Sequence, residues 1–297
     1  MTYIGRFAPS PTGPLHAGSL VTALASYLDA RAHRGQWLLR IEDTDAQRVR
    51  RGAAESIVDT LSRLGMQPDG EVSFQSRRLQ RYAAAFERLR ATGLVYPCGC
   101  TRAELADSRI QWGAASTPEC GELVYPGTCR QGLPNGRSAR SWRVRVNTAP
   151  IIWSDRSGKK HHDALESMIG DFVVYRADGV WAYQLAVVVD DAEQAVTDVV
   201  RGGDLEESTS RQIHLQHLLG FPTPRYLHIP VVLAADGQKL SKQTGATPID
   251  TLQPIKALNR SMQHLGLSPI ETGSLESFWS AAIAQWAQSR WMGRPTA

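Results

Sequence analysis

The chain has 297 residues, of which 42% are hydrophobic and 21% are charged, and its formal net charge is +4 at pH 7. These values exclude a disordered or fibrous chain, and a chain of this length can bury a full core without disulfide bonds. The sequence contains no apolar run of the roughly 18 residues that a membrane span needs and no signal-peptide pattern at its start. We therefore expect a cytoplasmic protein of one large or two smaller domains, with no membrane partner.

The first part of the chain alternates strands and helices. Residues 3–8 predict a short strand that runs into a proline-rich loop, and residues 17–33 predict a helix because leucines recur every fourth residue. A buried strand is predicted over 37–41, followed by helices over 53–64 and 78–92. This order is typical of parallel strand–helix–strand units, and it predicts an α/β fold.

The middle of the chain breaks that order. Residues 96–169 hold all four cysteines, several glycines and prolines, and few periodic apolar positions, so we interpret them as an insertion with its own small module. The elements expected after it are strands at 172–175, 183–189, 199–201 and 227–233, a helix over 208–219, and helices in a tail from residue 248.

Two segments carry residues suited to phosphate. The first, Pro9 to Ser19, joins a strand to a helix N-terminus, where unpaired N–H groups and the helix dipole favour an anion. Within it, Gly13 and Gly18 allow a close approach of the backbone, and His16 can donate to a phosphoryl oxygen. The second, residues 239–243, carries two lysines that can stabilise a developing pyrophosphate. Taken singly, each segment also fits an ordinary capped or solvated loop.

Together the two segments resemble the signature motifs of class I aminoacyl-tRNA synthetases. Residues 16–19, His-Ala-Gly-Ser, are similar to the HIGH motif, and residues 239–243, Lys-Leu-Ser-Lys-Gln, are similar to the KMSKS motif. The departures from those motifs are Ser19, Leu240 and Gln243. Three further segments are similar to the catalytic core of glutamyl- and glutaminyl-tRNA synthetases: residues 6–13, 40–45 and 200–204. The resemblance, from about residue 3 to residue 243, implies a Rossmann-like parallel sheet with ATP at the carboxyl ends of its strands.

This resemblance implies a pocket for glutamate. Arg6 and Arg201 match the arginines that would pair with the substrate carboxylates, and Glu42 matches the acid that would hold its ammonium group. The remaining residues of the implied pocket are Tyr183, Ser10 and the backbone near Ala8. An internal ion pair is the alternative role for Arg201 or Glu42.

The resemblance also implies an ATP site formed by His16, Gly18, Lys239, Ser241 and Lys242, with Mg²⁺ accompanying ATP. His16 and Lys242 would be the catalytic residues, because they would stabilise the transition state as the glutamate carboxylate attacks the α-phosphate. No protein nucleophile is required, since orientation and charge suffice for this reaction.

The cysteines indicate a metal site. Cys98, Cys100, Cys120 and Cys129 are clustered in a chain without a signal peptide, which favours metal binding over disulfides. On general grounds Cys120 would be the fourth thiolate of a tetrahedral zinc site. Resemblance to a short paralogue of glutamyl-tRNA synthetase implies Tyr125 instead, although zinc normally prefers thiolate. We expect one structural Zn²⁺ per chain, held by Cys98, Cys100, Tyr125 and Cys129. Cys120 in place of Tyr125, or no metal, are the alternatives.

The length of the C-terminal tail indicates which group of the tRNA would receive the glutamate. Only 54 residues follow Gln243, fewer than the part with which a glutamyl-tRNA synthetase reads the anticodon. The resemblance therefore points to the short paralogue, a ligase that activates L-glutamate with ATP and transfers it to the queuosine base in the anticodon of tRNA(Asp). The alternatives are a truncated glutamyl-tRNA synthetase that acylates a tRNA 3′ end and a non-catalytic regulator that binds glutamate or RNA.

These interpretations give a domain plan. Residues 1–95 and 170–247 are expected to form the two halves of the nucleotide-binding catalytic domain, and residues 96–169 the insertion with the zinc module. Residues 248–297 are expected to form a helical tail without an anticodon-binding domain, and the protein is expected to be a monomer.

Overall fold

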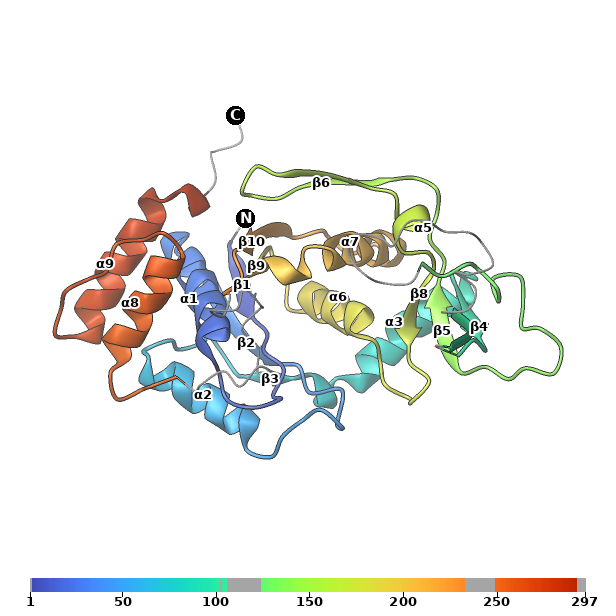
Figure 1. Cartoon of the computed structure of the whole chain (residues 1–297), viewed down its shortest axis with the longest axis horizontal. Helices are drawn as coiled ribbons and strands as arrows, with labels where there is room; N and C mark the ends of the chain where they lie inside the picture. Colours follow the sequence, from blue (N-terminus) through green and yellow to red (C-terminus); the bar gives the residue numbers. More distant parts are fainter. Residues whose placement is uncertain (1, 102, 106–123, 233–248, 293–297) are drawn as a thin grey trace.

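A five-stranded parallel sheet forms the centre of the computed structural model, which describes residues 2–101, 103–105, 124–232 and 249–292 (Figure 1). Its strands are β1 (Ile4–Phe7), β2 (Gln36–Ile41), β3 (Ser73–Phe74), β9 (Asp198–Gly202) and β10 (Arg225–Ile229). The order across the sheet is β10-β9-β1-β2-β3, and every neighbouring pair is parallel. The predicted α/β class with a parallel sheet is confirmed.

Helices cover both faces of this sheet. One apolar layer is formed with α1 (Ala17–Ala32), α2 (Ala53–Arg63), α8 (Pro254–His264) and α9 (Leu275–Gln288). The other is formed with α3 (Leu79–Ala91), α6 (Tyr183–Glu193) and α7 (Ser208–Leu219). Along β9, Val200 packs in the first layer and Val199 in the second, because successive side chains of a strand point to opposite faces. The strands are therefore buried on both sides, as in other parallel sheets.

A second, antiparallel sheet is built from strands within and beside the insertion. It contains β4 (Val95–Cys98), β5 (Ser141–Val144) and β8 (Phe172–Tyr175), in that order. A separate hairpin, β6 (Ile151–Ser154) with β7 (Lys160–Asp163), runs along α7 toward the parallel sheet, and α5 (Leu165–Met168) follows it (Figure 1). The predicted strand at 172–175 is thus present, but it pairs with β5 and not with the parallel sheet.

The strand predicted over 183–189 is wrong, because these residues begin helix α6. Every residue from Leu185 to Asp191 is buried, since α6 packs against α3, α7 and β8. A helix surrounded in this way is apolar on all sides and loses the 3.6-residue period, so its sequence looks like that of a buried strand.

The other expected elements are present within the described residues. The helices predicted at 17–33, 53–64, 78–92 and 208–219 match α1, α2, α3 and α7, and the tail contains α8 and α9. Strand β10 ends at Ile229, before the predicted end at residue 233, because Pro230 has no N–H to continue a ladder. Short 3-10 turns among the described residues are η1 (Gln75–Arg77), η2 (Gly203–Leu205) and η4 (Arg290–Met292). In the part of the chain that the structure describes, no helix has the length and apolar character to cross a bilayer.

One buried carboxylate joins distant parts of this fold. Asp29 of α1 is fully buried and accepts both terminal nitrogens of Arg156, at 2.6 and 2.9 Å. It also accepts the hydroxyl of Tyr3 and, at 3.0 Å, the indole N–H of Trp286 in α9. Burial alone would raise the pKa of Asp29, but these hydrogen bonds and the charge of Arg156 hold it below its ordinary value. The carboxylate is therefore ionised and fully satisfied.

We predict that Asp29→Asn lowers the free energy of unfolding by about 3 kcal/mol at pH 7, because it removes the two-point carboxylate partner of Arg156 and leaves that buried guanidinium only its longer contact with Asp198, at 3.3 Å. Because the folded-state pKa is depressed, this contribution is present above the ordinary pKa of 3.8 and disappears as the pH falls below it. Urea unfolding measures the difference. Asp59→Asn, which removes an exposed ion pair with Arg63, is the matched control and should cost less than about 0.5 kcal/mol. Equal losses in the two variants would contradict the prediction.

Candidate active site and metal centre

A cavity of about 830 Å³ opens at the carboxyl ends of the parallel strands. This is the edge at which open α/β sheets bind ligands. Its lining includes residues of β1 and β9 and the residues that directly follow β2 and β10. The sequence-predicted residues that it brings together are Arg6, Ala8, Ser10, His16, Gly18, Glu42, Tyr183 and Arg201. Lys239, Ser241 and Lys242, expected at the same site, lie outside the described residues.

The start of α1 faces this cavity with groups suited to an anion. His16 caps the helix: its Nδ1 accepts the backbone N–H of Ser19 at 3.3 Å, and its Nε2 lies 3.1 Å from the hydroxyl of Ser19. The first turn of α1 contains no acidic residue, so no side chain opposes the positive end of the helix dipole. Gly13 in the preceding loop has a φ of +145°, which glycine adopts without strain.

A cluster of buried charges adjoins the cavity, which Arg6 and Glu42 line. The carboxylate of Asp191 accepts Nε of Arg6 at 3.2 Å and a terminal nitrogen of Arg40 at 2.7 Å. Glu42 forms an ion pair with Arg40 of this cluster, with its Oε1 at 3.7 Å from a terminal nitrogen, beyond hydrogen-bond distance. The internal ion pair considered for Glu42 is therefore present. Among the described residues, this buried oxygen has no hydrogen-bond partner. Burial raises the pKa of Glu42 to about 7, against the opposing charges of Arg40 and Arg6.

Arg201 is a buried cation of a different kind. Its guanidinium donates to Gln212 Oε1 and Thr209 Oγ1, each at 2.8 Å, and lies over the ring of Tyr226. Within the described part of the chain, no carboxylate lies at ion-pair distance from Arg201, whereas Arg6 is paired with Asp191. The internal ion pair considered for Arg201 is therefore not found among these residues. A buried guanidinium without a counter-ion beside a cavity can bind a ligand carboxylate.

Tyr183, at the first position of α6, lines the same cavity. Burial raises the pKa of its hydroxyl, while the charges of Arg201 and Arg6 oppose this shift and that of Glu42 adds to it. Tyr183 therefore lies within electrostatic range of both arginines and of Glu42.

The sequence analysis did not select several residues of this cavity. Thr44, Asp45, Arg176 and Trp181 also line it, and Asp45 accepts a terminal nitrogen of Arg176 at 2.7 Å. The adjacent acids Asp190 and Asp191, which end the apolar run of α6, were a visible signal for the buried cluster. Their partners could not be identified from the sequence, because the ion pairs join residues more than 100 positions apart.

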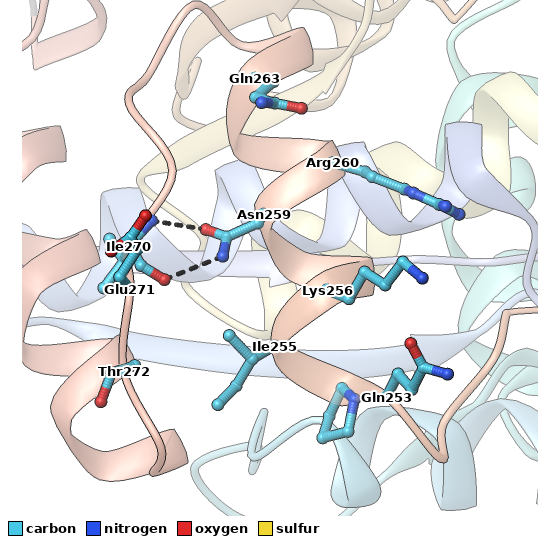
Figure 2. Close-up of a pocket in the computed structure, with 10 residues that line it drawn as sticks. Gln253, Ile255, Lys256, Asn259, Arg260, Gln263, Ile270, Glu271 and Thr272 are labelled. Carbon is cyan, nitrogen blue, oxygen red and sulfur yellow. Dashed lines mark hydrogen bonds between the residues drawn. The ribbon is translucent and has the colours of Figure 1, made fainter.

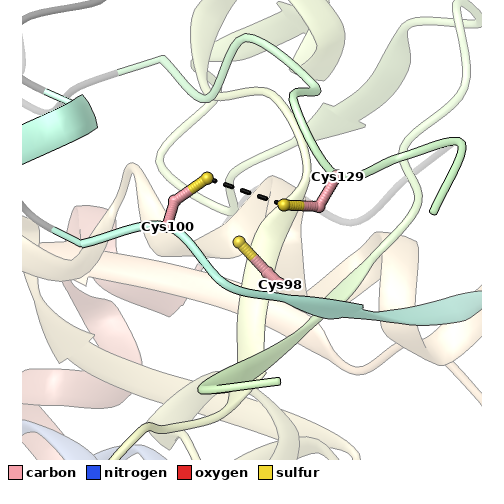
Figure 3. Close-up of side chains that lie close together, drawn as sticks. All are labelled: Cys98, Cys100 and Cys129. Atoms are coloured by element: carbon pink, nitrogen blue, oxygen red, sulfur yellow. Dashed lines mark hydrogen bonds between the residues drawn. The ribbon is translucent and has the colours of Figure 1, made fainter. Parts of the chain in front are cut away.

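Three cysteines form a second chemical centre, in the insertion. The sulfurs of Cys98, Cys100 and Cys129 lie within 4.8 Å of one another, and none is in a disulfide (Figure 3). The sulfurs of Cys100 and Cys129 are 3.6 Å apart. Tetrahedral zinc with bonds of about 2.3 Å to sulfur would separate its sulfur ligands by about 3.8 Å. The spacing therefore fits a metal ion of this type. Cys120 lies outside the described residues.

The hydroxyl of Tyr125 points at this cluster. It lies 3.5 Å from the sulfur of Cys98 and 3.9 Å from that of Cys100, and it accepts the backbone N–H of Cys129 at 2.8 Å. The side chain of Arg143 donates to Cys98 and covers the ring of Tyr125, and its charge favours the thiolate form of Cys98. Burial and the hydrogen bond with Cys98 raise the pKa of the Tyr125 hydroxyl. Although burial opposes ionisation, hydrogen bonds with Tyr125 and Arg143 lower the pKa of Cys98 to about 7.

A second cavity, of about 690 Å³, lies along α8 (Figure 2). Asn259 holds the segment after this helix: it accepts the backbone N–H of Ile270 at 2.8 Å and donates to the carbonyl of Ile270 at 2.9 Å. None of the residues selected from the sequence lines this cavity, so the candidate active site is the cavity at the strand ends.

Comparison with known proteins agrees with this geometry. The family of class I tRNA synthetases (E and Q), catalytic domain, matches residues 4–260. The chain is similar to the glutamate tRNA ligase of Elizabethkingia meningosepticum CCUG26117, solved in complex with its amino acid, with 30% identity and a TM-score of 0.70. That match covers 82% of this chain and 53% of the ligase, so the chain spans about half the length of that protein. Fold and site thus define a catalytic domain of class I tRNA synthetases.

Two curated relatives indicate which family of class I tRNA synthetases the chain belongs to. Proteins named glutamyl-Q tRNA(Asp) synthetase from Janthinobacterium sp. (strain Marseille) and Aromatoleum aromaticum are 58% and 54% identical to this chain. Each match covers 96% of this chain, with 97% of the first relative and 89% of the second. The chain therefore belongs to the class I tRNA synthetases and, within them, to the family named glutamyl-Q tRNA(Asp) synthetase.

The environment of Glu42 predicts a pH-dependent cost in stability. Its folded-state pKa of about 7 lies above the ordinary 4.5, so the folded state binds more protons and stability falls as the pH rises through this interval. Glu42→Gln should therefore stabilise the protein by about 2 kcal/mol more at pH 8 than at pH 5. Urea unfolding of both proteins at the two pH values provides the measurement. A difference that does not change with pH would show that the carboxyl group is not perturbed in this way.

Proposed function

We propose that this chain activates L-glutamate with ATP and transfers the glutamyl group to queuosine in the anticodon of tRNA(Asp). The observation that carries the activation of glutamate is that Arg201 and Glu42 line the same cavity. Arg201 is a buried cation without a carboxylate partner among the described residues, and Oε1 of Glu42 accepts no hydrogen bond from them. They are complementary to the carboxylate and the ammonium group of an amino acid. The names of the relatives support the acceptor.

In this proposal Arg6, Arg201 and Tyr183 bind the carboxylates of glutamate, and Glu42 binds the ammonium group. Ser10 and the backbone of Ala8 close the pocket next to β1. Because Asp191 already neutralises Arg6, Arg201 supplies the larger share of the attraction for the substrate carboxylate.

ATP is proposed to lie against the N-terminus of α1, where His16 and Gly18 reach the phosphates, and Lys239, Ser241 and Lys242 are proposed to bind the same nucleotide. The substrate carboxylate attacks the α-phosphorus, the bond to pyrophosphate breaks, and glutamyl-adenylate forms. His16 and Lys242 stabilise the negative charge that develops on the phosphoryl oxygens. Mg²⁺ bound to ATP would neutralise part of the remaining phosphate charge.

A hydroxyl of the queuosine diol then attacks the carbonyl carbon of the adenylate. The ester forms, the bond to phosphate breaks, and AMP leaves with the phosphoryl oxygen. Since ATP and tRNA are its substrates, the proposed compartment is the cytoplasm.

Transfer of labelled glutamate to purified tRNA(Asp), with and without queuosine, tests the proposal. We expect label only on the queuosine-containing tRNA, and nuclease digestion should map it to the anticodon fragment. Label at the 3′ end of either tRNA would instead identify an aminoacyl-tRNA synthetase. The absence of both glutamate-dependent pyrophosphate exchange and transfer would favour a non-catalytic protein. Omitting ATP provides the control.

We also propose that Cys98, Cys100, Tyr125 and Cys129 hold one structural Zn²⁺. The sulfur spacing and the position of the Tyr125 hydroxyl support this ligand set. When bound, the ion would link the end of β4 to the segment around residue 129. Gly170, with a φ of +70°, maintains the position of Tyr125, because a Cβ there would lie 2.4 Å from the carbonyl oxygen of Tyr125.

Two substitutions separate the proposed ligand from the alternative. After dialysis against a chelator, Tyr125→Phe should retain well under one zinc per chain, whereas Cys120→Ser should retain about one, as measured by elemental analysis. Tyr96→Phe is the matched control, because its hydroxyl bonds to Asp171 at 2.5 Å and not to the sulfurs. Retention by Tyr125→Phe with loss in Cys120→Ser would assign the fourth ligand to Cys120.

A further inference from the structure

Arg201 is held by His228 as well as by Gln212 and Thr209. The two residues are register partners on β9 and β10, and Nε of Arg201 donates to Nε2 of His228 at 3.1 Å. A guanidinium has five N–H donors, and the three partners use one on each nitrogen. One N–H on each terminal nitrogen therefore remains for a ligand. His228 fixes the end of the guanidinium opposite to these two nitrogens.

This arrangement requires one tautomer of His228. Nε2 can accept from Arg201 only if it carries no proton, so the proton must be on Nδ1. Nδ1 lies 2.7 Å from Oδ2 of Asp155, which also accepts the backbone N–H of His228 at 2.9 Å. Hydrogen bonds from His228 and Ser157 hold the pKa of Asp155 below its ordinary value, although burial acts to raise it. An ionised carboxylate can only accept, so Asp155 selects the tautomer that Arg201 needs.

Asp155 belongs to the insertion and not to the parallel sheet. It begins the turn between β6 and β7, at the end of the hairpin that runs along α7 (Figure 1). The turn is rigid, because Asp155 Oδ1 accepts the N–H of Ser157 at 2.7 Å and Arg156 is fixed to Asp29. The carboxylate of Asp155 is therefore held next to His228 by a turn that Arg156 fixes to α1. Side chains of His228 and Asp155 are only 5% and 2% exposed, so water does not compete for these bonds.

We propose that His228 and Asp155 are positioning residues for glutamate binding. Asp155 fixes the tautomer of His228, and His228 orients the guanidinium of Arg201 toward the substrate cavity. In the described part of the chain, neither residue is among those that line the cavity, so both act through Arg201. This inference rests on the proposed function, in which Arg201 binds a carboxylate of glutamate.

Two substitutions at one position test it. The side-chain oxygen of His228→Gln can reach the place of Nε2 and accept from Arg201, whereas that of His228→Asn is too short. Calorimetric titration with L-glutamate should give a Kd within threefold of the original protein for His228→Gln and about tenfold weaker or more for His228→Asn, the loss expected for a hydrogen bond to a charged donor. In pyrophosphate exchange, the KM for ATP should stay within twofold in both variants.

Asp155→Asn provides an independent variant, because its amide can donate to Nδ1 and so allow the tautomer with the proton on Nε2. We expect glutamate binding weaker than in the original protein, with the KM for ATP unchanged. If His228→Asn does not fold, as judged by circular dichroism, glutamate binding by Asp155→Asn tests the inference on its own. Glutamate binding that is unchanged in Asp155→Asn, or equal in the two His228 variants, would overturn the inference.

Different results would contradict the proposed function. Arg201→Ala should abolish glutamate binding, and the unaltered protein should catalyse glutamate-dependent pyrophosphate exchange. Exchange that is absent while glutamate binding depends on His228 would overturn the function alone. Binding that is unaffected by Arg201→Ala would overturn the glutamate site, and this inference with it.

Discussion

Arg6 and Arg40, on adjacent parallel strands, share the carboxylate of Asp191 next to the cavity at the strand ends. The neighbouring Asp190 accepts hydrogen bonds from Arg78, at 2.6 Å, and from Tyr82, at 2.8 Å. Charges buried this deeply are tolerated only when they are paired, and loss of one partner typically costs about 3–5 kcal/mol. This requirement fixes α6 against β1, β2 and α3. It thereby determines where Tyr183, at the start of the same helix, meets the cavity.

The charged side chains around the cavity differ in how far other protein groups neutralise them. Arg6 is neutralised from within the protein, whereas Arg201 is surrounded by neutral acceptors, so the two arginines present different potentials to a ligand. Glu42 is buried next to cations but not hydrogen-bonded to them, which leaves it available to an ammonium group at a cost in stability. Such local costs are common where a protein must bind a charged ligand.

The sequence was sufficient to predict the parallel sheet and the residues gathered at its edge. Glu42 and Arg201 were expected at one site from the family resemblance, and the structure brings them together because Glu42 directly follows β2, Arg201 lies near the end of β9, and the carboxyl ends of parallel strands lie at one edge. The sequence did not predict that α6 is a helix, because a helix buried on all sides lacks the 3.6-residue period of apolar positions. It also could not identify Asp155, since that residue reaches His228 through the turn of a hairpin 73 positions away in the chain. The roles of Lys239, Ser241 and Lys242 remain predictions.

Asp29 binds groups from both ends of the polypeptide, from Tyr3 to Trp286. A ribosome delivers the chain from its N-terminus, so α1 emerges long before α9 can cover it. During that interval the first helix exposes apolar surface, and its carboxylate lacks the contact with Trp286, which has not yet been synthesised. Contacts of such large sequence separation form slowly. Completion of the fold is therefore a late event in biosynthesis, and the incomplete chain is the species most exposed to aggregation and to the chaperones that prevent it.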